Sequence, residues 1–221
     1  MDAALFDLDG TLVLTEARSR LLWAAVFELH GVEADDDLLD QFVGRRGREV
    51  LREMPHLFPG RDPDSVTEEV WEYEDKLDLP PVRPVPGAVE LTGRIEAAGV
   101  PLALVTSARR PYAEDKLAAI DLADRFGVMV TGDDVMRGKP DPEGYLIGCA
   151  RLGVGPAGAV AFEDSPAGVK AAKGAGLYCV AVSTSVPPAE LAAADEVVAD
   201  LSEVSWPPAG GGRTGSTGKE G

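Results

Sequence analysis

Two carboxylates stand one residue apart near the start of the chain, directly after an apolar run. Asp7 and Asp9 follow the segment 3–6, and Gly10 and Thr11 come next. Successive side chains of a strand point to opposite faces, so both aspartates project from the same side. Like charges this close are costly unless a metal or a proton compensates them. The spacing predicts a reactive pair at a strand end, although similar spacings also occur in solvated turns and calcium loops.

Polar side chains also follow two later apolar runs. Thr106 and Ser107 offer hydroxyl and backbone N–H groups of the kind that hold a phosphoryl oxygen, although they are equally suited to cap the next helix. Lys139 stands between Gly138 and Pro140, which predicts an ammonium group held in a rigid loop rather than on a solvated helix face. We expect Thr106, Ser107 and Lys139 to bind a phosphoryl group.

A second pair of acids, Glu163 and Asp164, ends the apolar run 159–162. Acids at this point also suit a helix N-terminus through the helix dipole. Added to Asp7 and Asp9 they make four carboxylates beside one lysine, and that total needs a divalent metal. An all-oxygen ligand set favours magnesium. We therefore expect Mg²⁺ to be bound by these four acids.

The elements that position these residues follow from the apolar periodicity. Helical patterns cover 16–30, 35–43, 48–54 and 64–77, with no strand signal between residues 15 and 80, and a proline-rich run at 79–86 ends this region. Strand patterns at 3–6, 101–106, 128–131, 159–162, 177–182 and 196–199 then alternate with helical patterns at 88–98, 112–120, 142–152 and 166–175.

This alternation predicts an α/β fold with a Rossmann-like, doubly wound parallel sheet. We expect the core at 1–14 and 84–205, an inserted α-helical cap at 15–83, and a disordered tail at 206–221. Ligands of such sheets gather at the carboxyl ends of the strands. The four polar segments fall at those ends, so the fold would bring them together.

Composition limits the class of partner. Of the 221 residues 45% are hydrophobic and 27% charged, which is typical of a soluble globular protein. A net charge of −17 disfavours nucleic acids and anionic membranes as partners. No basic leader and no long apolar stretch is evident, so we expect a cytoplasmic monomer that acts on a small molecule.

Cys149 and Cys179 are interpreted as buried apolar residues.

The order of these segments resembles the four motifs of the haloacid dehalogenase superfamily of phosphohydrolases. The matching residues are Asp7-x-Asp9-Gly10-Thr11, Thr106, Lys139 within Gly-Lys-Pro-Asp-Pro, and Glu163-Asp164-Ser165-x-x-Gly168. The resemblance spans residues 3 to about 200. It implies a Rossmann-like core, a helical cap, an aspartyl-phosphate intermediate and a magnesium requirement. In its pattern Asp7 is the nucleophile, Asp9 the general acid and base, and Glu163 and Asp164 the acids on the metal side.

A cationic segment in the cap is the candidate for substrate selection. We expect Arg45, Arg46 and Arg48 to contact the substrate, and the alternative is a solvated arginine face paired with Glu49 and Glu53. The cap and the segment around Lys139 resemble the branch that holds sugar-phosphate and polyol-phosphate phosphatases and β-phosphoglucomutase. The expected function is magnesium-dependent hydrolysis of a small sugar or polyol phosphate monoester.

Three other classes of protein share part of this pattern. The arginine that the resemblance associates with mutases falls on Gly47, which favours hydrolysis, although Arg46 or Arg48 could substitute. The dehalogenase branch lacks an acid at the position of Asp9. A phospho-acceptor signalling module of the receiver type has no long helical insertion after its first strand, so the length and the cap argue against it.

Overall fold

The computed structural model of this chain describes residues 1–42 and 47–208. The chain divides into two compact units. The core unit consists of Met1–Val13 and the chain from Pro84 onward, and the cap unit consists of Leu14–Arg83.

A six-stranded sheet runs through the core unit in the order β5-β4-β1-β6-β7-β8, and each neighbouring pair is parallel. The strands are β1 (Ala3–Phe6), β4 (Leu102–Val105), β5 (Val128–Val130), β6 (Ala159–Glu163), β7 (Tyr178–Val182) and β8 (Glu196–Val198). The predicted Rossmann-like α/β fold is confirmed.

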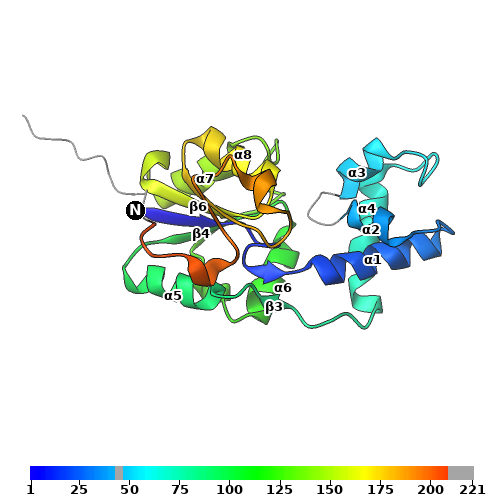
Figure 1. Ribbon diagram of the computed structural model, residues 1–221, viewed down its shortest axis with the longest axis horizontal. Helices are drawn as coiled ribbons and strands as arrows, with labels where there is room; N and C mark the ends of the chain where they lie inside the picture. The colour runs from blue at the N-terminus through cyan, green and yellow to red at the C-terminus, as the bar shows by residue number, and fades with distance from the viewer. Residues whose placement is uncertain (43–46, 209–221) are drawn as a thin grey trace, which may run out of the picture. The chain divides into compact units, whose positions relative to one another are not determined.

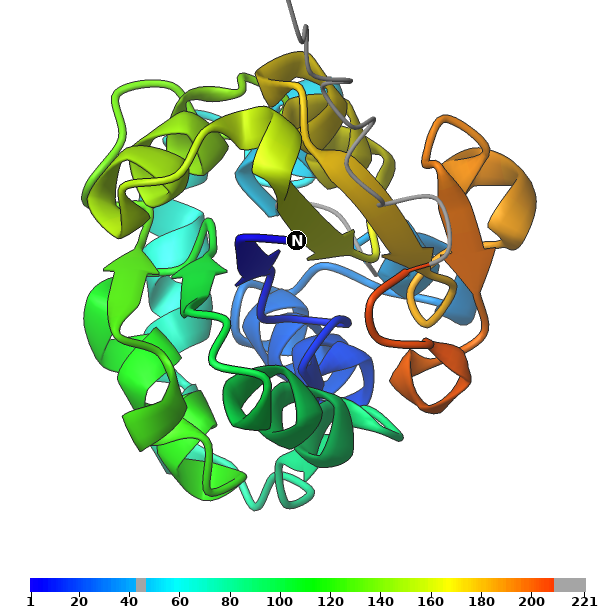
Figure 2. The same ribbon diagram turned by 90° about the vertical axis from the view of Figure 1, so that its left-hand side faces the viewer.

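Helices cover both faces of this sheet (Figures 1 and 2). They are α5 (Ala88–Ala97), α6 (Arg110–Ala119), α7 (Glu143–Leu152) and α8 (Pro166–Ala175). α7 packs on β1, β4 and β5, and α8 packs on β6 and β7, whereas α5 and α6 lie on the opposite face. Among the described residues no helix is both long and apolar enough to cross a membrane.

The first strand is fixed by apolar packing on both of its faces. All four residues of β1 are buried. Phe6 stacks on Phe162 of β6 with ring centroids 4.3 Å apart, and Leu5 belongs to the apolar cluster under α7 that includes Tyr145 and Cys149. Burying one such large side chain contributes about 1.5–3 kcal/mol. This packing sets the register that brings Asp7 to the end of the strand.

The order of the strands places a switch point beside β1. From β1 the chain moves to β4 and on to β5, and then crosses back to β6 on the other side of β1. Connections therefore leave the carboxyl ends of β1, β4 and β6 in different directions. Ligands of doubly wound sheets bind in the crevice that such a reversal creates.

The cap unit is helical over its described residues. It contains α1 (Glu16–Leu29), α2 (Asp36–Asp40), α3 (Gly47–Glu53) and α4 (Pro63–Glu72). Its core holds Trp23, Phe27, Phe42 and Phe58, with the Trp23 and Phe42 ring centroids 4.3 Å apart. The single helix predicted at 64–77 is wrong in extent, because α4 ends at Glu72 and a separate 3-10 helix follows.

Short elements complete the described fold. The 3-10 helices are Glu74–Lys76, Ala123–Arg125, Pro156–Gly158, Pro188–Leu191 and Leu201–Glu203. Two strands of two residues, β2 (Val13–Leu14) and β3 (Arg83–Pro84), pair with each other where the chain passes between the units. Neither strand was predicted, because two residues are too few to show an alternating pattern.

An ion cluster ties α1 to α4 in the cap unit. Glu69 accepts hydrogen bonds from the guanidinium of Arg61, with one contact at 3.1 Å, and lies 2.7 Å from Nε2 of His30. The hydrogen bonds from Arg61, aided by His30, outweigh the effect of burial and lower the pKa of Glu69 from 4.5 to about 2. The folded cap is therefore stabilised by the ionised form of this carboxyl group.

Replacing Glu69 with glutamine should lower the melting temperature in a pH-dependent way. Because the folded-state pKa lies below the ordinary value of 4.5, the stabilisation is complete above that value and is lost as the pH falls toward about 2. The difference in melting temperature between wild type and Glu69→Gln should shrink between neutral pH and about pH 3. Glu72→Gln, at an exposed position of the same helix, is the matched control. A difference that stays constant with pH would contradict this interpretation.

Candidate active site

Three acids predicted from separate parts of the sequence converge at the carboxyl ends of β1 and β6. Asp7 follows β1 directly, Glu163 is the last residue of β6, and Asp164 comes next. One carboxylate oxygen from each lies within 4.8 Å of the other two, and all three residues are buried. The close approach follows from the parallel register, which pairs Phe6 with Phe162.

Lys139 supplies a positive charge to this cluster from the loop before α7. Its ammonium lies 2.5 Å from Oδ1 of Asp7 and also pairs with Oε1 of Glu163. It donates a further hydrogen bond of 3.0 Å to the carbonyl of Val105, at the end of β4. The side chain of Lys139 is 10% exposed. The loop lysine therefore links the ends of three neighbouring strands.

Glu163 is held by burial and a side-chain hydrogen bond and is not the N-cap of the following helix. It is fully buried, and its Oε1 accepts a hydrogen bond of 2.7 Å from the hydroxyl of Tyr145 on α7. The cap of α8 is instead Ser165, whose side chain accepts from the backbone N–H of Gly168 at 3.1 Å. A Cβ atom at position 168 would lie 1.9 Å from the Glu163 carboxyl group. Glycine is required there because the carboxylate occupies the space.

The loop after β7 supports Asp164 and the turn that follows Asp9. Ser185 donates a hydrogen bond to Oδ2 of Asp164, and Thr184 donates one to the carbonyl of Gly10. Gly10 has φ of +74°, a conformation that residues with a side chain rarely adopt. This turn bends the chain sharply after the second aspartate.

Burial and repulsion disturb the ionisation of this cluster. Burial, opposed by Lys139 and reinforced by Glu163, raises the pKa of Asp7 to about 7. Burial and the charges of Asp7 and Glu163 likewise raise the pKa of Asp164 well above its ordinary value. Burial alone would lower the pKa of Lys139, but the carboxylates of Asp7 and Glu163 raise it above its ordinary value. One lysine is thus too little positive charge to keep Asp7 and Asp164 readily ionised.

The donor set fits a divalent metal ion. Three carboxylates supply only oxygen ligands, and hard cations such as Mg²⁺ and Ca²⁺ prefer oxygen. A cation at this point would stabilise the ionised forms of Asp7 and Asp164, which burial disfavours. The residues present are therefore suited to a metal, as the sequence indicated.

Asp9 lies beside this cluster but outside the group of three. It is half-buried, and its Oδ1 accepts a hydrogen bond of 2.8 Å from the hydroxyl of Tyr112 on α6. Its assignment as a fourth metal ligand stays a prediction. Its position two residues beyond Asp7 places it next to the nucleophile candidate.

Thr106 lies at the end of β4, where the sequence placed it. The residue is buried, and its hydroxyl accepts a hydrogen bond of 3.1 Å from the backbone N–H of Ala108. The N-cap of α6 is Arg109, which makes no side-chain capping bond, so neither Thr106 nor Ser107 is the N-cap of this helix. Phosphoryl binding by Thr106 and Ser107 stays a prediction.

Of the three cap arginines predicted to contact the substrate, only Arg48 lies within the described residues. Arg45 and Arg46 lie outside the described residues. Arg48, in the first turn of α3, lies 3.4 Å from Oδ1 of Asp64, an acid that the sequence analysis did not connect with it. Substrate contact by all three arginines stays a prediction.

Gly47, at the start of α3, is packed inside the cap unit. A Cβ atom at this position would lie 2.0 Å from Cζ2 of Trp23. Close packing against an aromatic ring of the cap core thus accounts for a glycine at this position. No larger side chain fits here unless Trp23 moves.

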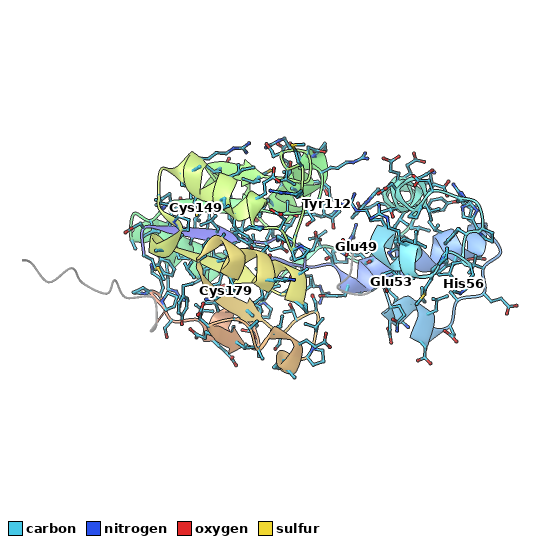
Figure 3. All side chains as sticks on the ribbon, turned by 90° about the horizontal axis from the view of Figure 1, so that it is seen from above. Glu49, Glu53, His56, Tyr112, Cys149 and Cys179 are labelled. Atoms are coloured by element: carbon cyan, nitrogen blue, oxygen red, sulfur yellow. The ribbon has the colours of Figure 1, made fainter. Side chains whose placement is uncertain are left out.

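Three supporting side chains were not recognised from the sequence. Tyr112, Tyr145 and Ser185 each donate a hydrogen bond to one of the predicted acids. The two cysteines are free and buried, as expected, with Cys149 on α7 and Cys179 on β7 (Figure 3). Only Tyr145 could have been suspected from the sequence, if it had been predicted to be buried near the acidic site, where its hydroxyl would need a hydrogen-bond partner.

The fold and the site together define a Rossmann-like α/β protein with buried acids and a lysine at the sheet's switch point. The sequence profile of the haloacid dehalogenase-like hydrolases matches residues 4–182. The chain belongs to this family of enzymes.

Similar proteins fall in the same family branch. The chain is 45% identical to validoxylamine A 7'-phosphate phosphatase of Streptomyces hygroscopicus subsp. limoneus, over 92% of this chain and 96% of that protein. It is 31% identical to hexitol phosphatase A of Escherichia coli, over 91% and 92%. A crystal structure of CbbY from Rhodobacter sphaeroides with xylulose-(1,5)-bisphosphate has a TM-score of 0.80 and 29% identity, covering 92% of this chain and 96% of that chain.

Replacing Gly168 with alanine should displace the Glu163 carboxylate. We expect the free energy of unfolding to fall by about 1 to 2 kcal/mol, because lost charged hydrogen bonds outweigh the helix-forming advantage of alanine. Urea denaturation measures this change. Gly155→Ala is the control, since φ there is −78° and no atom lies within 4 Å of the added Cβ. Equal stability of Gly168→Ala and wild type would show that Glu163 is not tightly held.

Proposed function

We propose that this protein is a magnesium-dependent phosphatase that hydrolyses a small sugar or polyol phosphate monoester through a phosphorylated Asp7. The observation that carries the proposal is the meeting of Asp7, Lys139 and the paired acids Glu163 and Asp164 in one buried cluster. A nucleophile, a cation for the phosphoryl group and ligands for a metal are thereby side by side. The names of the two phosphatases similar to this chain support the same substrate class.

Asp7, Glu163 and Asp164 would hold the metal, and Asp9 is a candidate fourth ligand. When bound, Mg²⁺ would neutralise negative charge on the phosphoryl oxygens and on the carboxylates that face them. Lys139 contributes a second positive charge, because its ammonium already contacts Asp7. A dianionic phosphate ester could not otherwise approach this group of acids.

In the first half-reaction a carboxylate oxygen of Asp7 forms a bond to phosphorus, and the bond between phosphorus and the ester oxygen breaks. Asp9 donates a proton to that oxygen, so the sugar or polyol leaves as a neutral alcohol. Thr106, Ser107 and Lys139 would hold the phosphoryl oxygens in line with Asp7.

In the second half-reaction Asp9 takes a proton from water as the water oxygen bonds to phosphorus. The bond between phosphorus and Asp7 breaks, which releases inorganic phosphate and restores the carboxylate. Asp9 therefore ends the cycle protonated, as it began. Its place two residues beyond Asp7 suits both steps.

The cap would select the leaving group, with Arg45, Arg46 and Arg48 as the proposed contacts. A mutase would need a second phosphate site there. An arginine at position 47, which the resemblance associates with mutases, would need its Cβ 2.0 Å from Cζ2 of Trp23. This packing favours hydrolysis over phosphosugar transfer.

Asp7→Asn should abolish the release of inorganic phosphate, because an amide oxygen is too weak a nucleophile to form the intermediate. The substrate panel should contain hexitol phosphates, hexose and pentose phosphates, nucleotides and validoxylamine A 7'-phosphate. Asp2→Asn, at the exposed start of the same strand segment, is the matched control and should retain full activity. Phosphate release by Asp7→Asn at the wild-type rate would refute the nucleophile assignment.

Magnesium should raise the melting temperature of the protein after treatment with a chelator. The increase arises because the metal binds the folded cluster and not the unfolded chain. Asp164→Asn should reduce the increase strongly, whereas Asp195→Asn, at an acid that pairs with Lys173 instead, should leave it unchanged. Differential scanning calorimetry with and without MgCl₂ measures the effect. An identical increase in the Asp164 variant would exclude this residue as a ligand.

A further inference from the structure

The side chain of Tyr112 on α6 forms a hydrogen bond to the acidic loop after β1. Its hydroxyl donates to Oδ1 of Asp9 at 2.8 Å, across 103 residues of sequence. Figure 3 shows it on the core unit, at the start of α6. The four motifs that carry the family resemblance do not include this tyrosine.

The ring of Tyr112 is fixed by its neighbours. The ammonium of Lys116, one helical turn later, lies 4.6 Å from the ring centroid. Lys116 is only 3% exposed and pairs with Asp115 at 2.9 Å. A cation over an aromatic face attracts the ring, so this contact helps to hold the ring in place.

The backbone around Tyr112 is also constrained. α6 begins at Arg110, four residues after Thr106, and Pro111 occupies its first turn. Proline in the first turn is already in a helical conformation. The loop that carries the predicted phosphoryl-binding Thr106 thus continues directly into the helix that carries Tyr112. The hydroxyl is therefore fixed relative to the expected position of the phosphoryl group.

We propose that Tyr112 is a positioning residue for Asp9, an inference that rests on the proposed function. Its hydroxyl donates to Oδ1 of Asp9 and so helps to fix the orientation in which the carboxyl group exchanges a proton with the leaving group and with water. Loss of this bond removes a restraint on rotation of the carboxyl group about its Cβ–Cγ bond, and the proton is then presented in a less defined direction. Proton transfer by a positioned group depends on such alignment.

The effect of losing the Tyr112 hydroxyl should depend on the leaving group of the substrate. An alkoxide is a poor leaving group, so a sugar or polyol ester needs the proton from Asp9 as its bond breaks. Nitrophenolate leaves without a proton. Loss of the Tyr112 hydroxyl should therefore slow the phosphorylation of Asp7 by an alkyl phosphate far more than by p-nitrophenyl phosphate.

The test compares Tyr112→Phe with wild type in single-turnover experiments with excess enzyme. With a hexitol phosphate the rate of alcohol release should fall about tenfold, and with p-nitrophenyl phosphate the rate of nitrophenol release should change less than about twofold. The phenylalanine ring keeps the contact with Lys116. Tyr73→Phe is the matched control, since Tyr73 in the cap unit also has a lysine ammonium 4.6 Å from its ring centroid.

The ratio of the two rates separates a positioning role from a loss of folded enzyme, because a loss of folded enzyme lowers both rates by the same factor. Equal reductions with both esters, or none with either, would overturn the positioning role. In an Asp9→Asn background Tyr112→Phe should cause no further reduction with the hexitol phosphate, and an undiminished effect there would also overturn it. If wild type releases phosphate from neither ester, the proposed function itself fails, and this inference fails with it.

Discussion

The organisation of the site depends on the repulsion among three carboxylates that the sheet forces together. Asp7, Glu163 and Asp164 are buried at adjacent strand ends, and a single ammonium, that of Lys139, contacts two of them. Buried like charges are tolerated only when partners compensate them. The protein provides part of that compensation through Lys139, Tyr145 and Ser185. The remaining repulsion would be relieved by the proposed metal ion, which would also allow an anionic phosphoryl group to approach.

The same constraint explains why small residues recur around the cluster. The Glu163 carboxylate fills the space beside Gly168, and the sharp turn at Gly10 brings Asp164 and Ser185 close to the backbone. Protein interiors are close-packed, so an added methyl group here would displace a functional carboxylate rather than enter a void. The acids are consequently held by packing as well as by hydrogen bonds.

Much of this arrangement could be predicted from the sequence, because strand ends and polar residues coincide in it. The apolar run before Asp7 and the run before Glu163 mark buried parallel strands, and a doubly wound sheet brings their ends together. The supporting contacts could not be predicted in the same way. Tyr112 and Asp9 are 103 residues apart, and which helical tyrosine reaches the loop depends on packing that periodicity does not specify. Gly47 similarly has a partner, Trp23, that only the folded cap identifies.

Under the proposed function Asp7 becomes covalently phosphorylated during turnover. The most direct measurement is mass spectrometry of the N-terminal peptide after acid quenching of the magnesium-loaded enzyme in the first turnovers with a hexitol phosphate. A phosphoryl group on Asp7 should appear before free phosphate and decay as phosphate accumulates. Steady turnover with no phosphorylated peptide, or with the phosphoryl group on another residue such as Ser107, would contradict this assignment.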